Sequence, residues 1–107
     1  MQRTIGEFEE LILLMVAALQ GDAYGVSILE NLELRAQKKF NISAVHVALK
    51  RLEDKGFLKS KFGGISPERG GRRKKLYVVT ALGKRMLDET YALRTGLYKE
   101  ISRLSFN

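Results

Sequence analysis

The chain has 107 residues, of which 45% are hydrophobic, so it can form one domain with a modest core. It contains no cysteine and a single histidine, which excludes a disulfide framework, thiol catalysis and a cysteine or histidine zinc site. Its net charge is +7, and it has neither a signal-peptide core nor an apolar run near the roughly 20 residues that span a bilayer. We therefore expect a cytoplasmic protein without a metal or cofactor.

The charge is distributed unevenly along the chain. Residues 1–34 carry one cation and six carboxylates, residues 35–75 carry thirteen cations and three carboxylates, and residues 76–107 add five cations and three carboxylates. Clustered lysine and arginine side chains neutralise phosphates and release counterions condensed on a nucleic acid. The middle of the chain is therefore the predicted contact region for a polyanion. A solvated basic surface without a ligand is the alternative.

The first helix is predicted to begin with a capping box at Thr4 and Glu7, in which each side chain accepts the other residue's backbone amide. Gly21 suits the position that follows its end. Apolar residues recur at helical spacing from Phe8 to Leu19, which predicts that most of this helix is core. The apolar run is wide, so a surface for a partner is the alternative interpretation of part of it.

A second helix is predicted from about Tyr24 to Lys38, with Asp22 as its N-cap. Its apolar side consists of Val26, Ile28, Leu29, Leu32 and Ala36. Tyr24 lies in the first turn, where its ring either covers the core or brings its hydroxyl to a phosphate. After this helix, Phe40 and Ile42 are expected to anchor the connector inward.

The third helix is predicted to run from Ser43, its N-cap, to Lys55 and to stop at Gly56, with Phe57 contacting Leu52 in a Schellman motif. One side has apolar residues at i, i+3, i+4 and i+7, which predicts burial of Val45, Ala48, Leu49 and Leu52. The other side stays accessible and is partly cationic. It carries His46, Val47, Lys50 and Arg51.

A β-hairpin is predicted directly after this helix. Its first strand runs from Phe57 to Phe62, with Lys59 and Lys61 on the same face, and its second strand runs from Lys74 to Val79. Residues 63–73 form a glycine-rich loop, and residues 68–75 hold five cations against one carboxylate. A nucleotide-binding loop is disfavoured because this loop leads into a strand and lacks the Walker and dinucleotide spacings.

The last helix is predicted from Ala81 to about Phe106, with Thr80 as its N-cap. At 1.5 Å per residue it would be roughly 35 to 40 Å long, so its end must protrude from a domain of this size. Its apolar arc is too wide for one contact within the chain, and Gly96 marks a kink or a close crossing.

A symmetric homodimer is the economical way to cover that arc. The residues predicted to form the dimer contact are Leu87, Tyr91, Arg94, Leu97, Tyr98, Ile101 and Leu104. A helix lying on a membrane surface is the competing interpretation, but the mixed charge of the polar side argues against it.

Several stretches of the sequence resemble the PadR family of bacterial transcriptional regulators, and the likeness covers nearly the whole chain. The matching stretches are residues 22–26, 43–56, 67–75 and 77–83, and the run 49–56 followed by the basic hairpin is the specific combination. The resemblance implies a mainly α (α+β) fold, namely a winged helix-turn-helix of three helices and a two-stranded β-wing, followed by one long helix. It also implies that the third helix is the recognition helix and that the last helix joins two subunits.

We expect residues 1–80 to form the winged-helix DNA-binding domain and residues 81–107 to form a dimerisation helix packed on the same core. Many members of the family have glycine and threonine in place of Ser43 and Ala44, tyrosine in place of His46 and proline in place of Val47. The resemblance therefore implies no operator sequence. Some small members bind planar drugs in the dimer cleft, where tryptophan is prominent, and this chain has no tryptophan.

The predicted function is a homodimeric repressor that binds double-stranded DNA at an inverted repeat. The residues expected at base edges are Ser43, His46, Val47 and Lys50, with His46 alternatively a bystander at the rim. The residues expected at phosphates are Arg51, Lys59, Lys61, Arg69, Arg72, Arg73, Lys74 and Lys75. The resemblance leaves open a small-molecule effector without naming it. The alternative function is a winged-helix module whose basic face binds an acidic protein, and an enzyme is disfavoured.

Overall fold

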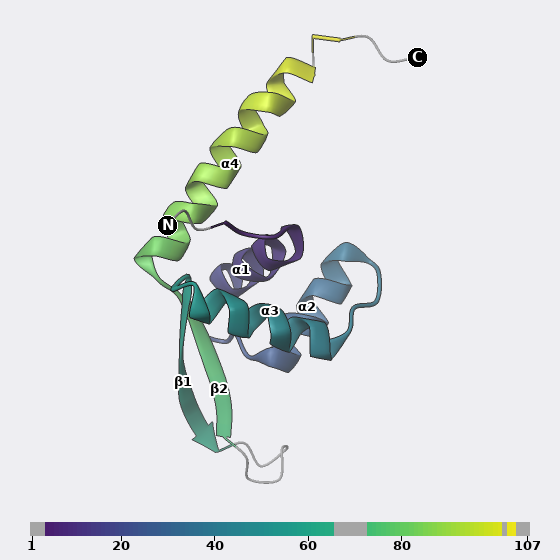
Figure 1. Cartoon of the computed structure of the whole chain (residues 1–107). Helices are drawn as coiled ribbons and strands as arrows, with labels where there is room; N and C mark the ends of the chain where they lie inside the picture. Colours follow the sequence, from purple (N-terminus) through teal and green to yellow (C-terminus); the bar gives the residue numbers. More distant parts are fainter. Residues whose placement is uncertain (1–3, 66–72, 102, 105–107) are drawn as a thin grey trace.

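Four helices and a two-stranded antiparallel sheet make up the part of the chain that the computed structural model describes, residues 4–65, 73–101 and 103–104 (Figure 1). In chain order they are α1 (Glu7–Leu19), α2 (Gly25–Ala36), α3 (Ile42–Asp54), β1 (Leu58–Ile65), β2 (Arg73–Val79) and α4 (Ala81–Ile101). In Figure 1, α1, α2 and α3 lie together, the hairpin extends from them in one direction and α4 extends in the other. The predicted winged-helix fold with a long terminal helix is confirmed.

The core lies between the three helices of the body and the base of the hairpin. The largest fully buried side chains are Phe57, Ile12, Leu13, Ile28, Leu32, Leu49, Leu52, Val16 and Val45. Burial of each such side chain stabilises the fold by about 1.5 to 3 kcal/mol. The four residues predicted to seal α3 into the core are all buried, whereas Val26 and Ala36 of α2 are exposed. The inner side of α3 is thus fixed by packing, and its outer side is left for contacts.

The helix starts differ from the predicted ones. α1 begins after Gly6, whose amide donates to Oε1 of Glu9 at 3.2 Å, so the capping carboxylate is Glu9 rather than Glu7. The N-cap of α3 is Asn41, whose Oδ1 accepts the amide of Ser43 at 2.7 Å. Neighbouring short polar residues can all serve as caps, and the spacing alone does not choose between them.

The N-cap of α2 is Tyr24 rather than Asp22. The hydroxyl of Ser27 accepts the amide of Tyr24 at 3.0 Å and lies 2.7 Å from the carbonyl oxygen of Asp22, to which it can donate. Asp22 therefore contributes its backbone carbonyl, and the capping side chain comes from inside the helix.

The stop after α3 is the predicted Schellman motif. The amide of Phe57 donates to the carbonyl of Leu52 at 2.9 Å, and the amide of Gly56 donates to the carbonyl of Glu53 at 3.0 Å. Gly56 has a φ of 85°, a left-handed conformation that favours glycine. The chain therefore turns at once from α3 into the hairpin.

The hairpin is longer than predicted, because β1 begins at Leu58 and continues to Ile65. Leu58 pairs with Val79, Ser60 with Tyr77 and Phe62 with Lys75, and the register shifts beyond Phe62. Leu58 and Tyr77 are buried at the base, whereas Phe62 lies on the same face beyond the body and is 63% exposed. The amide of Tyr77 donates to the carbonyl of Ala23 at 2.8 Å, which joins β2 to the connector before α2.

α4 ends at Ile101 rather than near Phe106, so its 21 residues span about 31 Å at 1.5 Å per residue. Thr80 caps it as predicted, because its Oγ1 accepts the amide of Gly83 at 3.0 Å and donates to the carbonyl of Gly56 at 2.6 Å. Among the described residues, no helix combines the length and apolar character needed to cross a bilayer.

Candidate nucleic-acid interface

The outer side of α3 is accessible along its length. The five predicted recognition-helix residues, which are Ser43, His46, Val47, Lys50 and Arg51, are all exposed. Val47 is 51% exposed although it is apolar. An exposed methyl-bearing side chain among polar neighbours can contact a thymine methyl group in a major groove. The fold thus places these residues on one surface that a groove can reach.

Lys50 is paired within its own helix. Its Nζ lies 3.5 Å from Oδ1 of Asp54, four residues later, and both side chains are mostly exposed. An exposed pair of this kind contributes about 0 to 1 kcal/mol, so Lys50 can leave Asp54 at little cost. Asp54 was not predicted as a partner of Lys50, although a lysine and a carboxylate at i and i+4 of a helix commonly pair.

Arg51 belongs to an ion-pair cluster that joins α3 to α1. Oε1 of Glu9 lies 2.7 Å from Nζ of Lys55, and Oε2 of Glu9 lies 3.9 Å from Nη1 of Arg51. Lys55 also donates to the carbonyl of Thr4 at 2.8 Å. Burial by itself would raise the pKa of Glu9, but hydrogen bonds from Lys55 and the Gly6 amide and the charges of Lys55 and Arg51 hold that pKa below its usual value.

A hollow of about 430 Å³ lies between this cluster and the outer side of α3. Phe8, Ala44, Val47 and Ala48 supply its apolar lining, and Arg51 lies at its polar part. The start of α1 therefore borders the same surface that carries the predicted base-reading residues.

The hairpin is held to α3 through Glu53. Oε2 of Glu53 accepts the hydroxyl of Ser60 on β1 at 2.6 Å, and Oε1 lies 3.7 Å from Nζ of Lys75 on β2. Nζ of Lys75 also lies 5.7 Å from the centre of the Tyr77 ring. Lys75, predicted to bind phosphate, is thus partly engaged within the protein. Glu53 was missed because its partners, Ser60 and Lys75, lie on the hairpin rather than at a helical spacing within α3.

Lys59 and Lys61 are exposed, and because side chains alternate along a strand they lie on the face opposite Ser60 and α3. Nζ of Lys74 lies 4.4 Å above the centre of the Tyr24 ring, a cation–π contact that joins the wing to the start of α2. Arg69 and Arg72 lie outside the described residues, and the structure describes only the backbone of Arg73.

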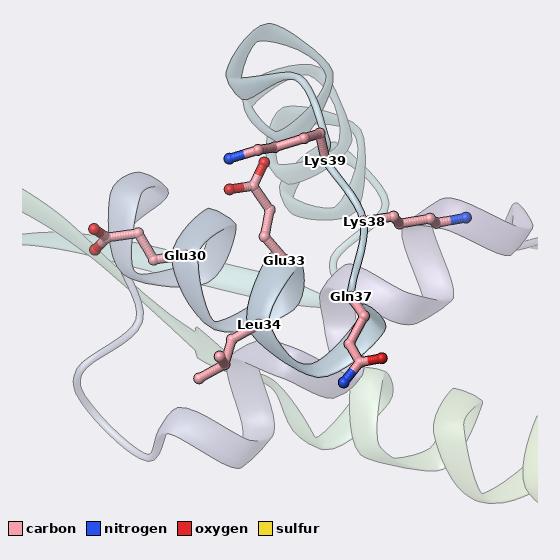
Figure 2. Close-up of a pocket in the computed structure, with 6 residues that line it drawn as sticks. All are labelled: Glu30, Glu33, Leu34, Gln37, Lys38 and Lys39. Carbon is pink, nitrogen blue, oxygen red and sulfur yellow. The ribbon is translucent and has the colours of Figure 1, made fainter.

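A second concave surface of about 520 Å³ lies at the end of α2 (Figure 2). Two carboxylates and two ammonium groups line it, from Glu30, Glu33, Lys38 and Lys39, and Figure 2 shows the two lysines pointing in different directions. Glu33 accepts the amide of Phe40 at 2.8 Å, which ties α2 to the connector before α3. Its charges balance, so this surface does not extend the basic one.

The likeness to known proteins agrees with this geometry. Residues 13–89 match the family model described as the transcriptional regulator PadR-like family. A PadR family transcription regulator from Clostridium difficile is 28% identical, with a TM-score of 0.70 over 92% of this chain and 97% of that chain. No curated protein matches the chain.

Two further solved structures share the fold at lower identity. A PadR-like transcription factor from Bacteroides fragilis has a TM-score of 0.75 at 22% identity, covering 92% of this chain and 89% of that one. A PadR family regulator from Eggerthella lenta has a TM-score of 0.68 at 23% identity, covering 91% of this chain and 84% of that one. Because the family model matches more than half of the residues of this chain, the chain belongs to the PadR-like family of transcriptional regulators.

Proposed function

We propose that the protein is a homodimeric repressor that binds double-stranded DNA at an inverted repeat. Each α3 lies in a major groove, and each hairpin lies along the flanking backbone or minor groove. One observation carries this proposal: the outer side of α3 is exposed beside a basic hairpin, and Glu53 clamps the two together.

The division of contacts follows from the chemistry of the side chains. Ser43, His46, Val47 and Lys50 are assigned to base edges, which supply sequence preference. Arg51, Lys59, Lys61 and Lys74 are assigned to phosphates, which supply affinity for any sequence, and so are Arg69, Arg72 and Arg73. Lys75 joins this set only if it leaves Glu53, because the pair occupies its ammonium group in the free protein.

The outer half of α4 supports the proposed dimer. Large side chains are exposed there and just beyond its end, namely Tyr91 at 71%, Leu93 at 63%, Leu97 at 56%, Tyr98 at 70% and Ile101 at 42% in the helix and Leu104 at 63% after it. Two predicted dimer residues have partners within the chain, because Leu87 is 8% exposed in the core and Arg94 lies 2.9 Å from Oε1 of Glu10. The proposed dimer surface is therefore the apolar arc of α4 beyond Leu87, with Leu93 added to the predicted residues. Residues 1–80 are the proposed DNA-binding unit.

Part of α1 is suited to the same surface. Leu11 and Leu14 are 39% and 48% exposed, and both follow Glu10, whose carboxylate pairs with Arg94 of α4. These residues support the alternative reading of the first helix as partly a partner surface. Exposed apolar area on two adjacent helices is what a subunit contact needs.

The test is selection of bound sequences from random duplex DNA, followed by titrations with the selected site and a scrambled duplex. The expected result is an inverted repeat with half-sites about one or a few helical turns apart. A protein that binds both duplexes equally would instead fit the alternative function, a module whose basic face binds an acidic partner.

Two lysine variants test the division of contacts. Lys61→Ala should reduce the slope of log K against log salt by about 0.9 and keep the sequence preference. Lys50→Ala should relax preference at one base pair by about 1 to 3 kcal/mol. Lys84→Ala is the matched control, because Lys84 is exposed on α4 and pairs with Asp88. Equal losses on all sequences from Lys50→Ala and Lys61→Ala would contradict the assignment.

A further inference from the structure

The first turn of α2 lies directly against the single histidine of the chain. Gly25 is the first residue of α2, and a Cβ atom placed on it would lie 2.7 Å from Cε1 of His46. The next nearest atoms are Nε2 and Nδ1 of the same ring, at 3.3 and 3.5 Å. The imidazole therefore occupies the space that a side chain at position 25 would take.

The backbone itself does not require glycine at this position. The described glycines with a left-handed φ are Gly21 and Gly56, and Gly25 is not one of them. Alanine forms helices better than glycine, so a glycine in the first turn of α2 makes that helix less stable. What the glycine provides is room for the His46 ring.

This turn is held in place from several sides. The hydroxyl of Ser27 accepts the Tyr24 amide and lies within hydrogen-bond reach of the Asp22 carbonyl, which closes the turn on itself. The carbonyl of Ala23 accepts the amide of Tyr77, which fixes the turn to β2. A ring resting on this turn thus rests on a rigid part of the body.

His46 is also placed where a base contact is expected. It is exposed, and it shares a face of α3 with Ser43 and Lys50, which are three and four residues away. The same turn of α2 carries Tyr24, whose ring holds the ammonium of Lys74 on the wing. The turn therefore touches one side chain of the recognition helix and one of the wing. A side chain oriented before binding loses less freedom on binding.

We propose that Gly25 is a specificity-determining positioning residue. Because glycine has no side chain, the His46 imidazole can pack against the first turn of α2. This contact holds the ring in the orientation in which it contacts a base edge. This inference rests on the proposed DNA-binding function and adds a residue that itself touches no base.

Three variants of the full chain test it: Gly25→Ala, His46→Ala and the double variant. Each single variant should lower the preference for the selected inverted repeat over scrambled duplex by about five- to tenfold, the lower part of the range for one specific base contact. The double variant should lose no more than either single one, because both changes act on the same contact. The salt slope should stay unchanged, since no phosphate contact is lost.

Gly25→Ala should fold, because the ring it displaces is the far end of a side chain that can swing aside. Its thermal midpoint should not fall, while the NMR signals of the imidazole should shift. Gly6→Ala is the matched control at another helix start, where the nearest atom to the added Cβ is 3.7 Å away, and it should keep the full preference.

Four results would overturn the proposal. The first three are full preference in Gly25→Ala although the imidazole signals have moved, full preference in His46→Ala, and losses that multiply in the double variant. The fourth is a lower thermal midpoint of Gly25→Ala together with an equal loss of affinity for both duplexes, because this result would show that Gly25 serves packing alone. Failure of the proposed function is seen separately, as a wild-type protein that does not distinguish the two duplexes.

Discussion

The two halves of α4 lie in opposite surroundings. Gly83, in its first turn, is so close to the body that a Cβ there would lie 2.3 Å from the carbonyl oxygen of Phe57, and Leu87 is buried. Beyond Arg94, Leu97 and Tyr98 are 56% and 70% exposed. The first half therefore belongs to the core of its own chain. The second half presents apolar surface that the described part of its own chain does not cover, as the proposed dimer contact requires.

The largest expected effect comes from making the outer half polar. Leu93→Asp combined with Leu97→Asp should convert the proposed dimer to a monomer, seen as a halved mass in sedimentation equilibrium. Operator affinity should then fall on the order of 100-fold, because the two half-sites no longer bind as one ligand. Leu34→Asp is the control, because Leu34 is 76% exposed on α2, and it should leave the mass unchanged. A double variant that remains dimeric would place the subunit contact elsewhere.

A smaller effect is expected from adding a side chain at Gly83, where the first half of α4 packs against the body. Gly83→Ala must move α4 away from the backbone of Phe57, and such overpacking should lower the free energy of unfolding by about 2 kcal/mol. Gly96→Ala is the matched change in the outer half, where nothing lies within 4 Å of the added Cβ. In the monomeric background it should raise helix stability by about 0.5 to 1 kcal/mol. Urea unfolding that shows the same change for both would contradict the contrast between the halves.

The smallest effect concerns the charge that binds α1 to α3 inside the body. The pKa of Glu9 is lower in the folded state than its unfolded value of 4.5, so its charge stabilises the fold above pH 4.5. That contribution is lost as the pH falls through the folded pKa. Glu9→Gln should therefore remove about 1.5 kcal/mol at neutral pH, the low end for a hydrogen bond to a charged group.

The control for that change is Glu89→Gln, because Glu89 is exposed on α4. Urea unfolding across the acid range should show the wild type and Glu9→Gln converging below pH 4.5. A difference that stays constant from neutral to acid pH would assign the loss to packing rather than to charge.

Most of the fold was readable from local patterns. The helical period of α3 predicted its four buried residues, and the glycine after it predicted the Schellman stop that the structure contains. The caps of α1, α2 and α3 were wrong by a few residues. The polar residue Asn41 caps α3 in place of its neighbour Ser43, whereas α1 and α2 start at Gly6 and Tyr24, whose amides donate to side chains inside the helices. The end of α4 was also placed too late, since the apolar period continues beyond Ile101.

The candidate site was predictable as a set of residues but not as a set of contacts. The charge distribution selected the outer side of α3 and the hairpin. It did not show that Lys75 pairs with Glu53, or that Arg51 lies near Glu9, because each pair joins elements distant in sequence. The contact of Gly25 with His46 was equally hidden, since it depends on how α2 crosses α3.

Glu53 of α3 contacts both strands of the hairpin. Because both strands are tied to the helix, their angle to it is set before any duplex is encountered. In the proposed DNA complex, α3 and the hairpin therefore act as one rigid unit, so that a change in the angle of α3 in the groove also changes the angle of the hairpin. In the proposed homodimer, operators with different separations between half-sites would therefore be accommodated at the contact between the two subunits.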